Sequence, residues 1–256
     1  MDACEVKWGI AIVGAAAVIG FGLMLAPGAA QPAQGDQHLA DTFDNGLCAG
    51  SDECPWYFQQ RVDGEVRAEP VAGRGGLALH ALAGPKRGET VAKAALVARI
   101  APAGQGSVIR VSFDMMVPHG RPGNSLQLVD LECADCGWSH NPGVRLYLRH
   151  GRLRIDRSKI DVARAWMNDA GPQMERGRWH HVAYEMLVSA GDDGWARAFL
   201  DGREVVGGTG RTLMTKRMEW IDRVQVGLTA NSNPEPAELW VDNVKIDVTA
   251  PAGKAR

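Results

Sequence analysis

Apolar and polar residues alternate along short segments of this chain, and turn-forming residues separate the segments. Between 107 and 117, Ile109, Val111, Phe113 and Met115 share one face, whereas Arg110, Ser112 and Asp114 occupy the other. A period of two is typical of a strand that buries one of its faces. The pattern predicts strands at 57–62, 76–82, 92–100, 107–117, 125–132, 180–189, 195–200, 203–206, 224–229 and 239–248, with a hairpin at 143–157.

The hairpin has the clearest pattern. His150-Gly151 separates two alternating runs, and a two-residue loop that ends in glycine favours a tight antiparallel turn. Arg149 then pairs with Arg152, and Tyr147 with Arg154. One face carries Val144, Leu146, Leu148, Leu153 and Ile155, and the other carries Arg145, Tyr147, Arg149, Arg152 and Arg154. Arginine binds carboxylate and sulfate oxygens in pairs, so the second face predicts an anionic partner. The alternative is a charged strand face that only contacts solvent.

The spacing of the strands predicts an all-β fold. Many short strands with turns between them are typical of an antiparallel sandwich or barrel rather than of alternating strands and helices. We expect one domain over residues 39–249, a short first strand and turn at 41–46, and a disordered tail at 250–256. The connections at 157–175 and 212–222 are long enough for a turn or two of helix, or for a lid.

The N-terminus has a different composition. Residues 8–25 are apolar and uncharged, and small residues follow, among them Gly28 and Ala30. Residues 1–30 are therefore expected to be either a signal peptide cleaved near Ala30 or a retained membrane anchor, with a linker at 31–38. In both cases the domain is secreted or periplasmic, and it meets a membrane only through residues 8–25 if these are not removed.

Export changes how the cysteines are interpreted. Cys48, Cys54, Cys133 and Cys136 follow the apolar segment, and an even number of cysteines in an oxidising compartment predicts two disulfides. Four cysteines allow three pairings, which the sequence leaves open. The local pairing of 48 with 54 and of 133 with 136 is the simplest.

The net charge of −2 argues against nucleic acid as the partner, because nucleic-acid-binding proteins usually carry a broad basic excess. The positive charge is local to the hairpin. We expect a monomer whose partner is an acidic polysaccharide or glycan.

Four later segments carry a family resemblance. GRWHHVAYEM, AFLDGREVV, VQVGLTANSN and LWVDNVKID, in this order after the arginine-bearing hairpin, resemble the laminin-G-like and concanavalin A-like jelly-roll superfamily. The resemblance implies two stacked antiparallel sheets, one of them curved so that its concave face forms a groove for glycan. It does not choose between a lectin, a glycoside hydrolase and a polysaccharide lyase.

The main functional prediction is a carbohydrate-binding jelly roll that holds an acidic polysaccharide across an arginine-rich concave sheet. Arg149, Arg152 and Arg154 would bind the acidic groups, and Trp138 would stack on a sugar ring. Binding through arginine–carboxylate pairs exposed to water should weaken steeply with salt.

The alternative is a lyase that cleaves a uronate polysaccharide by β-elimination. This reaction needs a cation for the substrate carboxylate and a base for the C5 proton, which Arg145 with Tyr147 or His140 would supply. Gln127 resembles the glutamine of the Gln-Ile-His run in alginate-lyase-like jelly rolls, although Leu128 and Val129 follow it and the histidine of that run is missing.

A glycoside hydrolase is the lesser alternative. The resemblance implies a Glu-x-Asp-x-(x)-Glu run on the central strand, and Leu128-Val-Asp130-Leu-Glu132 is the nearest match. Leu128 stands where the first carboxylate belongs, so only two acids remain to flank a glycosidic bond.

A structural calcium ion is also predicted. In jelly rolls of this kind an aspartate of the last strand can meet oxygens from the first turn. Asp242 with Asp41 and Asp44 would supply the oxygen ligands that calcium prefers.

Overall fold

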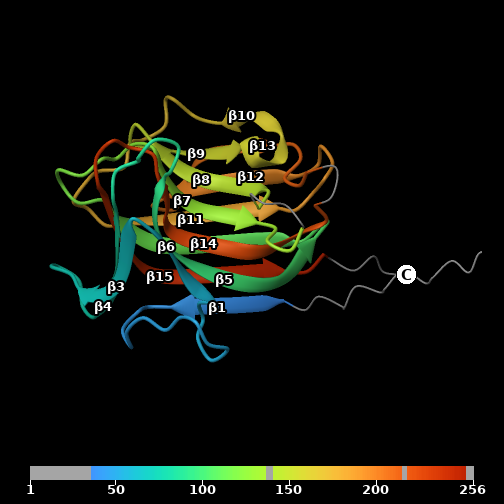
Figure 1. Cartoon of the computed structure of the whole chain (residues 1–256). Helices are drawn as coiled ribbons and strands as arrows, with labels where there is room; N and C mark the ends of the chain where they lie inside the picture. Colours follow the sequence, from blue (N-terminus) through green and yellow to red (C-terminus); the bar gives the residue numbers. More distant parts are fainter. Residues whose placement is uncertain (1–35, 137–140, 215–217, 252–256) are drawn as a thin grey trace, which may run out of the picture. The chain divides into compact units, whose positions relative to one another are not determined.

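The computed structural model describes residues 36–136, 141–214 and 218–251, and two antiparallel sheets account for most of them (Figure 1). The larger sheet has the strand order β13-β12-β11-β6-β15-β4-β3, with β1 pairing with β15. The smaller sheet has the order β10-β9-β8-β7-β14-β5-β2. The fold is therefore the antiparallel β-sandwich that the spacing of the strands predicts.

The strand bounds follow the predicted segments closely. The larger sheet contains β1 (Gln37–Asp41), β3 (Gly64–Pro70), β4 (Leu77–Ala83), β6 (Val108–Met116), β11 (His180–Leu187), β12 (Trp195–Leu200), β13 (Arg203–Thr209) and β15 (Ala237–Thr249). The smaller sheet contains β2 (Phe58–Val62), β5 (Ala92–Gly104), β7 (Leu126–Glu132), β8 (Gly143–Arg149), β9 (Arg152–Arg157), β10 (Val162–Trp166) and β14 (Trp220–Asn231).

The core lies between the two sheets because each strand turns its apolar positions inward. On β6, Ile109, Val111 and Phe113 are fully buried. On β14, Val224 and Val226 are fully buried as well, and they face the same core. Since side chains alternate along a strand, the intervening residues of β14 and its neighbours form the outward face of the smaller sheet.

The hairpin has the predicted register. Arg149 pairs with Arg152, Tyr147 with Arg154, and Arg145 with Asp156. His150 and Gly151 have φ values of 52° and 72°, as a two-residue turn of type I′ requires. The arginines and Tyr147 therefore share the outward face, as predicted.

Three elements differ from expectation. β1 begins at Gln37, inside the segment predicted as a linker, because its backbone pairs with β15. β3 was not predicted, since Val66 is the only fully buried position of its GEVRAEP sequence. The connection after β9 contains a single 3-10 turn at Ser158–Ile160 followed by β10, which extends the edge of the smaller sheet.

The export segment lies outside the described residues, so secretion and anchoring remain predictions. Within the described ranges, no helix has the length and apolar character needed to cross a membrane. Two disulfides join Cys48 to Cys54 and Cys133 to Cys136. Of the three pairings that the sequence allows, the structure thus has the local one.

Candidate active site

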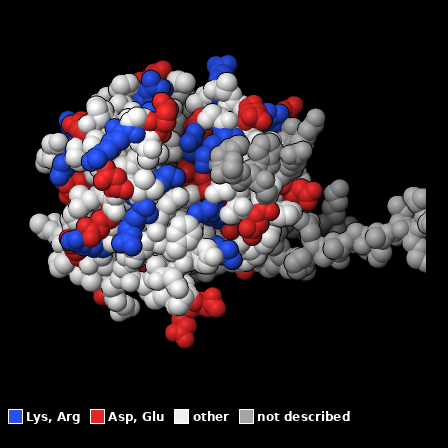
Figure 2. Space-filling model, in the orientation of Figure 1, with Lys and Arg blue, Asp and Glu red and all other residues white. Residues whose placement is uncertain are grey.

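The outward face of the smaller sheet is polar and carries charges of both signs. Strands β7, β8 and β14 lie toward the viewer in Figure 1. Seen from the same side, Lys and Arg are interleaved with Asp and Glu, and the surface is not uniformly basic (Figure 2). The face therefore differs from the purely positive row that the hairpin sequence suggested.

Three of the predicted site residues come together on β7 and β8. Gln127 pairs with Tyr147 across the two strands. The Nη1 atom of Arg145 donates to Oε1 of Gln127 at 3.3 Å. All three side chains are partly exposed, so each can reach a ligand on the outward face. The structure thus brings an amide, a guanidinium and a phenol into one small area.

Arg145 is held by the neighbouring strand. Its Nε donates to Oδ2 of Asp156 at 2.9 Å, its Nη2 contacts the same oxygen, and Nη2 also donates to Oγ of Ser158 at 3.0 Å. Burial opposes ionisation of Asp156, but the Arg145 guanidinium more than offsets it, so the pKa of Asp156 lies below its ordinary value. Arg145 therefore has a fixed orientation and a charge that is partly neutralised.

The other hairpin arginines are held to different degrees. Arg154 forms an ion pair with Asp169 at 2.6 Å, and Nε of Arg152 donates to the carbonyl of Gly171 at 2.9 Å. Arg149 is exposed and forms no ion pair with any described residue. Of the three predicted substrate-binding arginines, Arg149 is therefore the one whose guanidinium is most available.

A buried pair of carboxylates lies beside this group. Asp130 and Glu132 are 3% and 2% exposed although they occupy outward positions of β7. Lys159, from the 3-10 turn, forms an ion pair with Glu132 and places its Nζ 3.7 Å from Oδ2 of Asp130. Gln225 of β14 also donates to Glu132. Both acids are buried and contact protein side chains. They therefore do not form the solvent-accessible pair that flanks a scissile bond in a glycoside hydrolase.

Burial changes the proton affinity of two groups on this face. Loss of solvent, helped by the Glu132 carboxylate, raises the pKa of Asp130 to about 6. Burial lowers the pKa of Lys93, although the carboxylates of Asp130 and Glu132 act in the opposite direction. An acid and a base with shifted pKa values on one face are typical of an active site, although structural ion pairs also cause such shifts.

Four residues of this face are not indicated by the sequence pattern: Lys93, Lys159, Arg223 and Gln225. Arg223 and Gln225 occupy outward positions of β14, where they pair with Glu132 and Asp130 across the sheet. Arg223 precedes the predicted strand 224–229, and only the strand order places Arg223 and Gln225 beside β7. Lys159 lies in a connection without alternation, so no local pattern indicated it.

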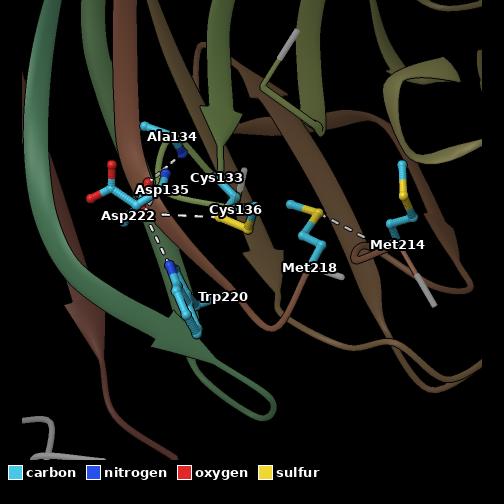
Figure 3. The surroundings of a disulfide bond; sticks show 8 residues. All are labelled: Cys133, Ala134, Asp135, Cys136, Met214, Met218, Trp220 and Asp222. Carbon is cyan, nitrogen blue, oxygen red and sulfur yellow. Dashed lines mark hydrogen bonds between the residues drawn. A yellow bond between two sulfur atoms is a disulfide. The ribbon is translucent and has the colours of Figure 1, made fainter. Parts of the chain in front are cut away.

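The disulfide loop that follows β7 is fastened to β14. Asp222 accepts hydrogen bonds from the backbone N–H groups of Ala134 and Asp135, at 2.6 and 3.2 Å, and from Nε1 of Trp220 at 2.9 Å. Figure 3 shows its side chain between Trp220 and the loop. Trp138 and His140, two other predicted site residues, lie outside the described residues.

The three acids predicted to bind calcium have protein partners. Asp41 accepts from the backbone N–H of Phe43 and from Nε1 of Trp56, and Asp44 accepts from the hydroxyl of Thr42 and the backbone N–H of Leu77. Asp242 is bound by the guanidinium of Arg74, so a cation at this position would have to compete with that guanidinium. No group of three or more His, Cys, Asp or Glu residues in the described ranges is placed to hold a metal. The calcium site stays a sequence-based prediction, and no step of the chemistry below depends on it.

Comparison with known proteins decides the family. A family model described as "Polysaccharide lyase" matches residues 105–245, which include Gln127, Arg145, Tyr147 and Lys159. The chain belongs to this polysaccharide lyase family. No curated protein sequence matches the chain. The two-sheet antiparallel sandwich and the match to this family support the predicted jelly-roll superfamily.

Solved structures of low sequence identity share the fold. An endo-β-1,4-glucuronan lyase from the fungus Trichoderma reesei is 16% identical, with a TM-score of 0.58 over 76% of this chain and 91% of that one. The cellulose-induced protein Cip1 is also 16% identical, with a TM-score of 0.55 over 81% and 96% of the two chains. The alginate lyase Aly36B, in complex with an alginate trisaccharide, is 12% identical, with a TM-score of 0.53 over 82% and 97%.

The family match favours the second of the two functional predictions. A non-catalytic or weakly catalytic carbohydrate-binding jelly roll was expected first, and a lyase second. Membership of a polysaccharide lyase family supports the second interpretation better than the first.

Proposed function

We propose that this chain is an exported lyase that cleaves a uronate-containing polysaccharide by β-elimination. The observation that carries the proposal is the contact among Gln127, Arg145 and Tyr147 within the segment that matches the lyase family. Related folds are named for their action on glucuronan and alginate, both of which are uronate polymers. These two polymers are therefore the substrates to test first.

β-Elimination requires a proton acceptor, a proton donor and groups that neutralise the substrate carboxylate. A base removes the proton from C5, which is acidic because the carboxylate group is attached to that carbon. The electron pair forms the C4–C5 double bond, the bond from C4 to the glycosidic oxygen breaks, and that oxygen takes up a proton. The protein must therefore neutralise the carboxylate and transfer a proton.

Tyr147 is the proposed proton-transferring group. Its side chain lies on the outward face beside Gln127, and no other tyrosine shares this position on β7 or β8. A phenol can accept the C5 proton as phenolate and return a proton to the leaving oxygen. His140, the other predicted base, lies outside the described residues and remains a candidate for the same role.

Arg145 and Gln127 are the proposed carboxylate-binding groups. The guanidinium of Arg145 is held by Asp156 and Ser158, so it does not need to reorganise when charge develops on the substrate. Gln127 can donate its amide N–H groups to the same carboxylate. Lys93 also lies on this face, and its lowered pKa makes it a further candidate for the base.

Ultraviolet absorbance of the reaction product tests the proposal. The new C4–C5 double bond is conjugated with the carboxylate and absorbs, whereas a hydrolase produces reducing ends without this absorbance and a binding protein produces neither. We expect absorbance to grow with glucuronan or alginate and not with a neutral glucan. If glucuronan, alginate, hyaluronan and heparin-type chains all give no absorbance, with calcium supplied, the lyase proposal fails.

A binding module is retained as the second candidate because of one feature of Arg145. Its guanidinium already carries a carboxylate partner, so its charge is less available to a substrate than that of a free arginine. If the second candidate is right, the protein binds acidic glycans in an array at low salt, leaves them intact, and prefers them to neutral ones.

A further inference from the structure

A cavity of about 290 Å³ opens beside β2 and β5, away from the hairpin. Its lining includes aromatic and charged residues, among them Tyr57, Phe58, Arg99, Trp220, Asp222 and Arg223. The cavity has no role in the proposed reaction. Two arginines and several aromatic rings make it suitable for a ligand that is both acidic and flat-faced.

The cavity lies in line with the proposed reaction centre. Across neighbouring strands, Arg145 pairs with Asp130, Asp130 with Gln225, and Gln225 with Val97. Val97 is a lining residue of the cavity. From β8 to β5 there are three strand spacings, or roughly 14 Å. A chain that crosses the strands at right angles would therefore pass over Arg145 and then over the cavity, some sugar residues further on.

Aromatic rings offer a platform for a sugar. Tyr57 is 46% exposed, which is unusual for a large ring in this protein, and the Arg99 guanidinium lies 3.9 Å from its centroid. Trp220 is half-buried, and its hydrogen bond to Asp222 fixes the plane of the ring. Asp222 also accepts hydrogen bonds from the backbone of the disulfide loop, so it connects Trp220 to that loop in this wall of the cavity.

One guanidinium of the cavity wall is open to an acidic ligand. Arg99 is exposed, and it forms no ion pair within the described ranges. The carboxylate of Asp222 is already used by three N–H donors. Arg223 is mostly buried and forms an ion pair with Glu132 at 3.9 Å, so Arg99 is the guanidinium of the wall that is open to a ligand. The exposed acid of the wall is Asp135.

We propose that this cavity is a distal subsite that binds a uronate residue of the same polysaccharide. Arg99 binds the sugar carboxylate, and the rings of Tyr57 and Trp220 contact the faces of the sugar. The inference rests on the proposed function, since it takes the substrate to be an acidic polysaccharide lying across this face. The subsite should make long chains bind better than short ones. The residues that provide this extra binding do not take part in the reaction.

Two variants test the subsite with glucuronate and alginate oligosaccharides of graded length. Arg99→Gln removes the charge and Tyr57→Ala removes the ring. For long oligosaccharides we expect each variant to raise KM on the order of 5- to 20-fold with kcat nearly unchanged, because binding is lost equally in the ground and transition states. For the shortest oligosaccharides that are cleaved, KM should equal that of the wild type. Arg203→Gln, an exposed arginine of β13, is the matched control and should change nothing.

Calorimetric binding of the same oligosaccharides separates failure of the subsite from failure of the lyase proposal. If the wild type produces no ultraviolet absorbance but Arg99→Gln still weakens binding of long acidic chains, the subsite stands and the lyase proposal falls. If cleavage occurs but Arg99→Gln and Tyr57→Ala bind all lengths like the wild type, the subsite is overturned. It is also overturned if the two variants lose the same factor at every length, or if the wild type binds none of the oligosaccharides.

Discussion

The carboxylate of Asp156 on β9 holds the guanidinium of Arg145 on β8 through two of its nitrogens. Both side chains are largely shielded, at 16% exposure for Arg145 and 18% for Asp156. The pair lies beside the residues that we propose to bind substrate. Its partners are therefore important both for stability and for the direction in which Arg145 points.

Asp156→Asn should destabilise the protein at neutral pH. Removing the carboxylate leaves a shielded guanidinium without its ionic partner, which costs about 1–3 kcal/mol. The pKa of Asp156 is lowered in the folded state, so its contribution is present above the unfolded pKa of about 4 and is lost as the pH falls through the folded pKa. The urea midpoints of the two proteins should therefore differ at pH 7, and the difference should shrink progressively as the pH is lowered below about 4.

Asp169→Asn is the matched control for this change. Asp169 also pairs with a hairpin arginine, Arg154, but its side chain is 73% exposed. Exposed ion pairs contribute about 0–1 kcal/mol, so its loss should be small at both pH values. Equal destabilisation by the two substitutions would contradict the role given to burial of the Arg145–Asp156 pair.

Tyr147→Phe should abolish turnover and preserve binding. Only the hydroxyl that transfers the proton is lost, and such a group contributes about 10²- to 10⁴-fold to the rate. The Kd for a long oligosaccharide should stay within about 2-fold, because the ring and its neighbours are unchanged. Tyr184→Phe is the control, since the hydroxyl of Tyr184 is buried without a hydrogen-bond partner in the described ranges. Full activity of Tyr147→Phe would transfer the proton-transfer role to another residue, with Lys93 and His140 to be tested next.

Asp130→Asn should change how stability depends on pH. The pKa of Asp130 is raised to about 6 in the folded state, so the folded protein holds a proton that the unfolded chain has released. As the pH rises from about 4 to about 6, this group should therefore lower the free energy of unfolding of the wild type by at most about 3 kcal/mol.

Asp130→Asn lacks this titrating carboxyl group, so its thermal midpoint should fall less than that of the wild type as the pH rises from about 4 to about 6. Asp192→Asn, an exposed turn position, should reproduce the wild-type slope. Parallel pH profiles for the wild type and Asp130→Asn would show that burial of this carboxyl group does not control the stability.

Replacing both Cys133 and Cys136 by serine should have a small effect on stability and a larger one on binding. The disulfide closes a very short loop, for which chain entropy predicts about 2 kcal/mol. The loop forms one wall of the cavity beside Trp220, so KM for long oligosaccharides should rise. The paired serine substitution at Cys48 and Cys54 should cost similar stability without changing KM. If the two double variants have the same KM, the loop does not support the distal subsite.

The sequence predicted the parts of the fold and the site that depend on neighbouring residues. The hairpin register followed from alternation and the turn within one short segment, so Arg145 and Tyr147 were placed correctly on one face. Gln127 was found through a resemblance, and its contact with Arg145 is seen only in the structure.

Residues that meet through strand order could not be found in this way. Lys159 reaches Glu132 from a 3-10 turn, and Gln225 reaches it from a strand almost a hundred residues later. No local period encodes which strands are neighbours in a sheet. β14 lies between β5 and β7 in the sheet although it is far from both in the sequence. The carboxylate pair, its cations and the cavity were missed for that reason.

The interleaving of Lys and Arg with Asp and Glu in Figure 2 has a kinetic consequence. A row of unpaired arginines would attract a polyanion from a distance and accelerate its association, and it would also retain the chain afterwards. Here the fields of Arg145 and Arg154 largely cancel against Asp156 and Asp169 beyond a short range. Capture should therefore depend mainly on contact, and association should slow less with added salt than it would for a free arginine row. For the proposed lyase, such a surface would let a long product chain dissociate or slide forward after cleavage.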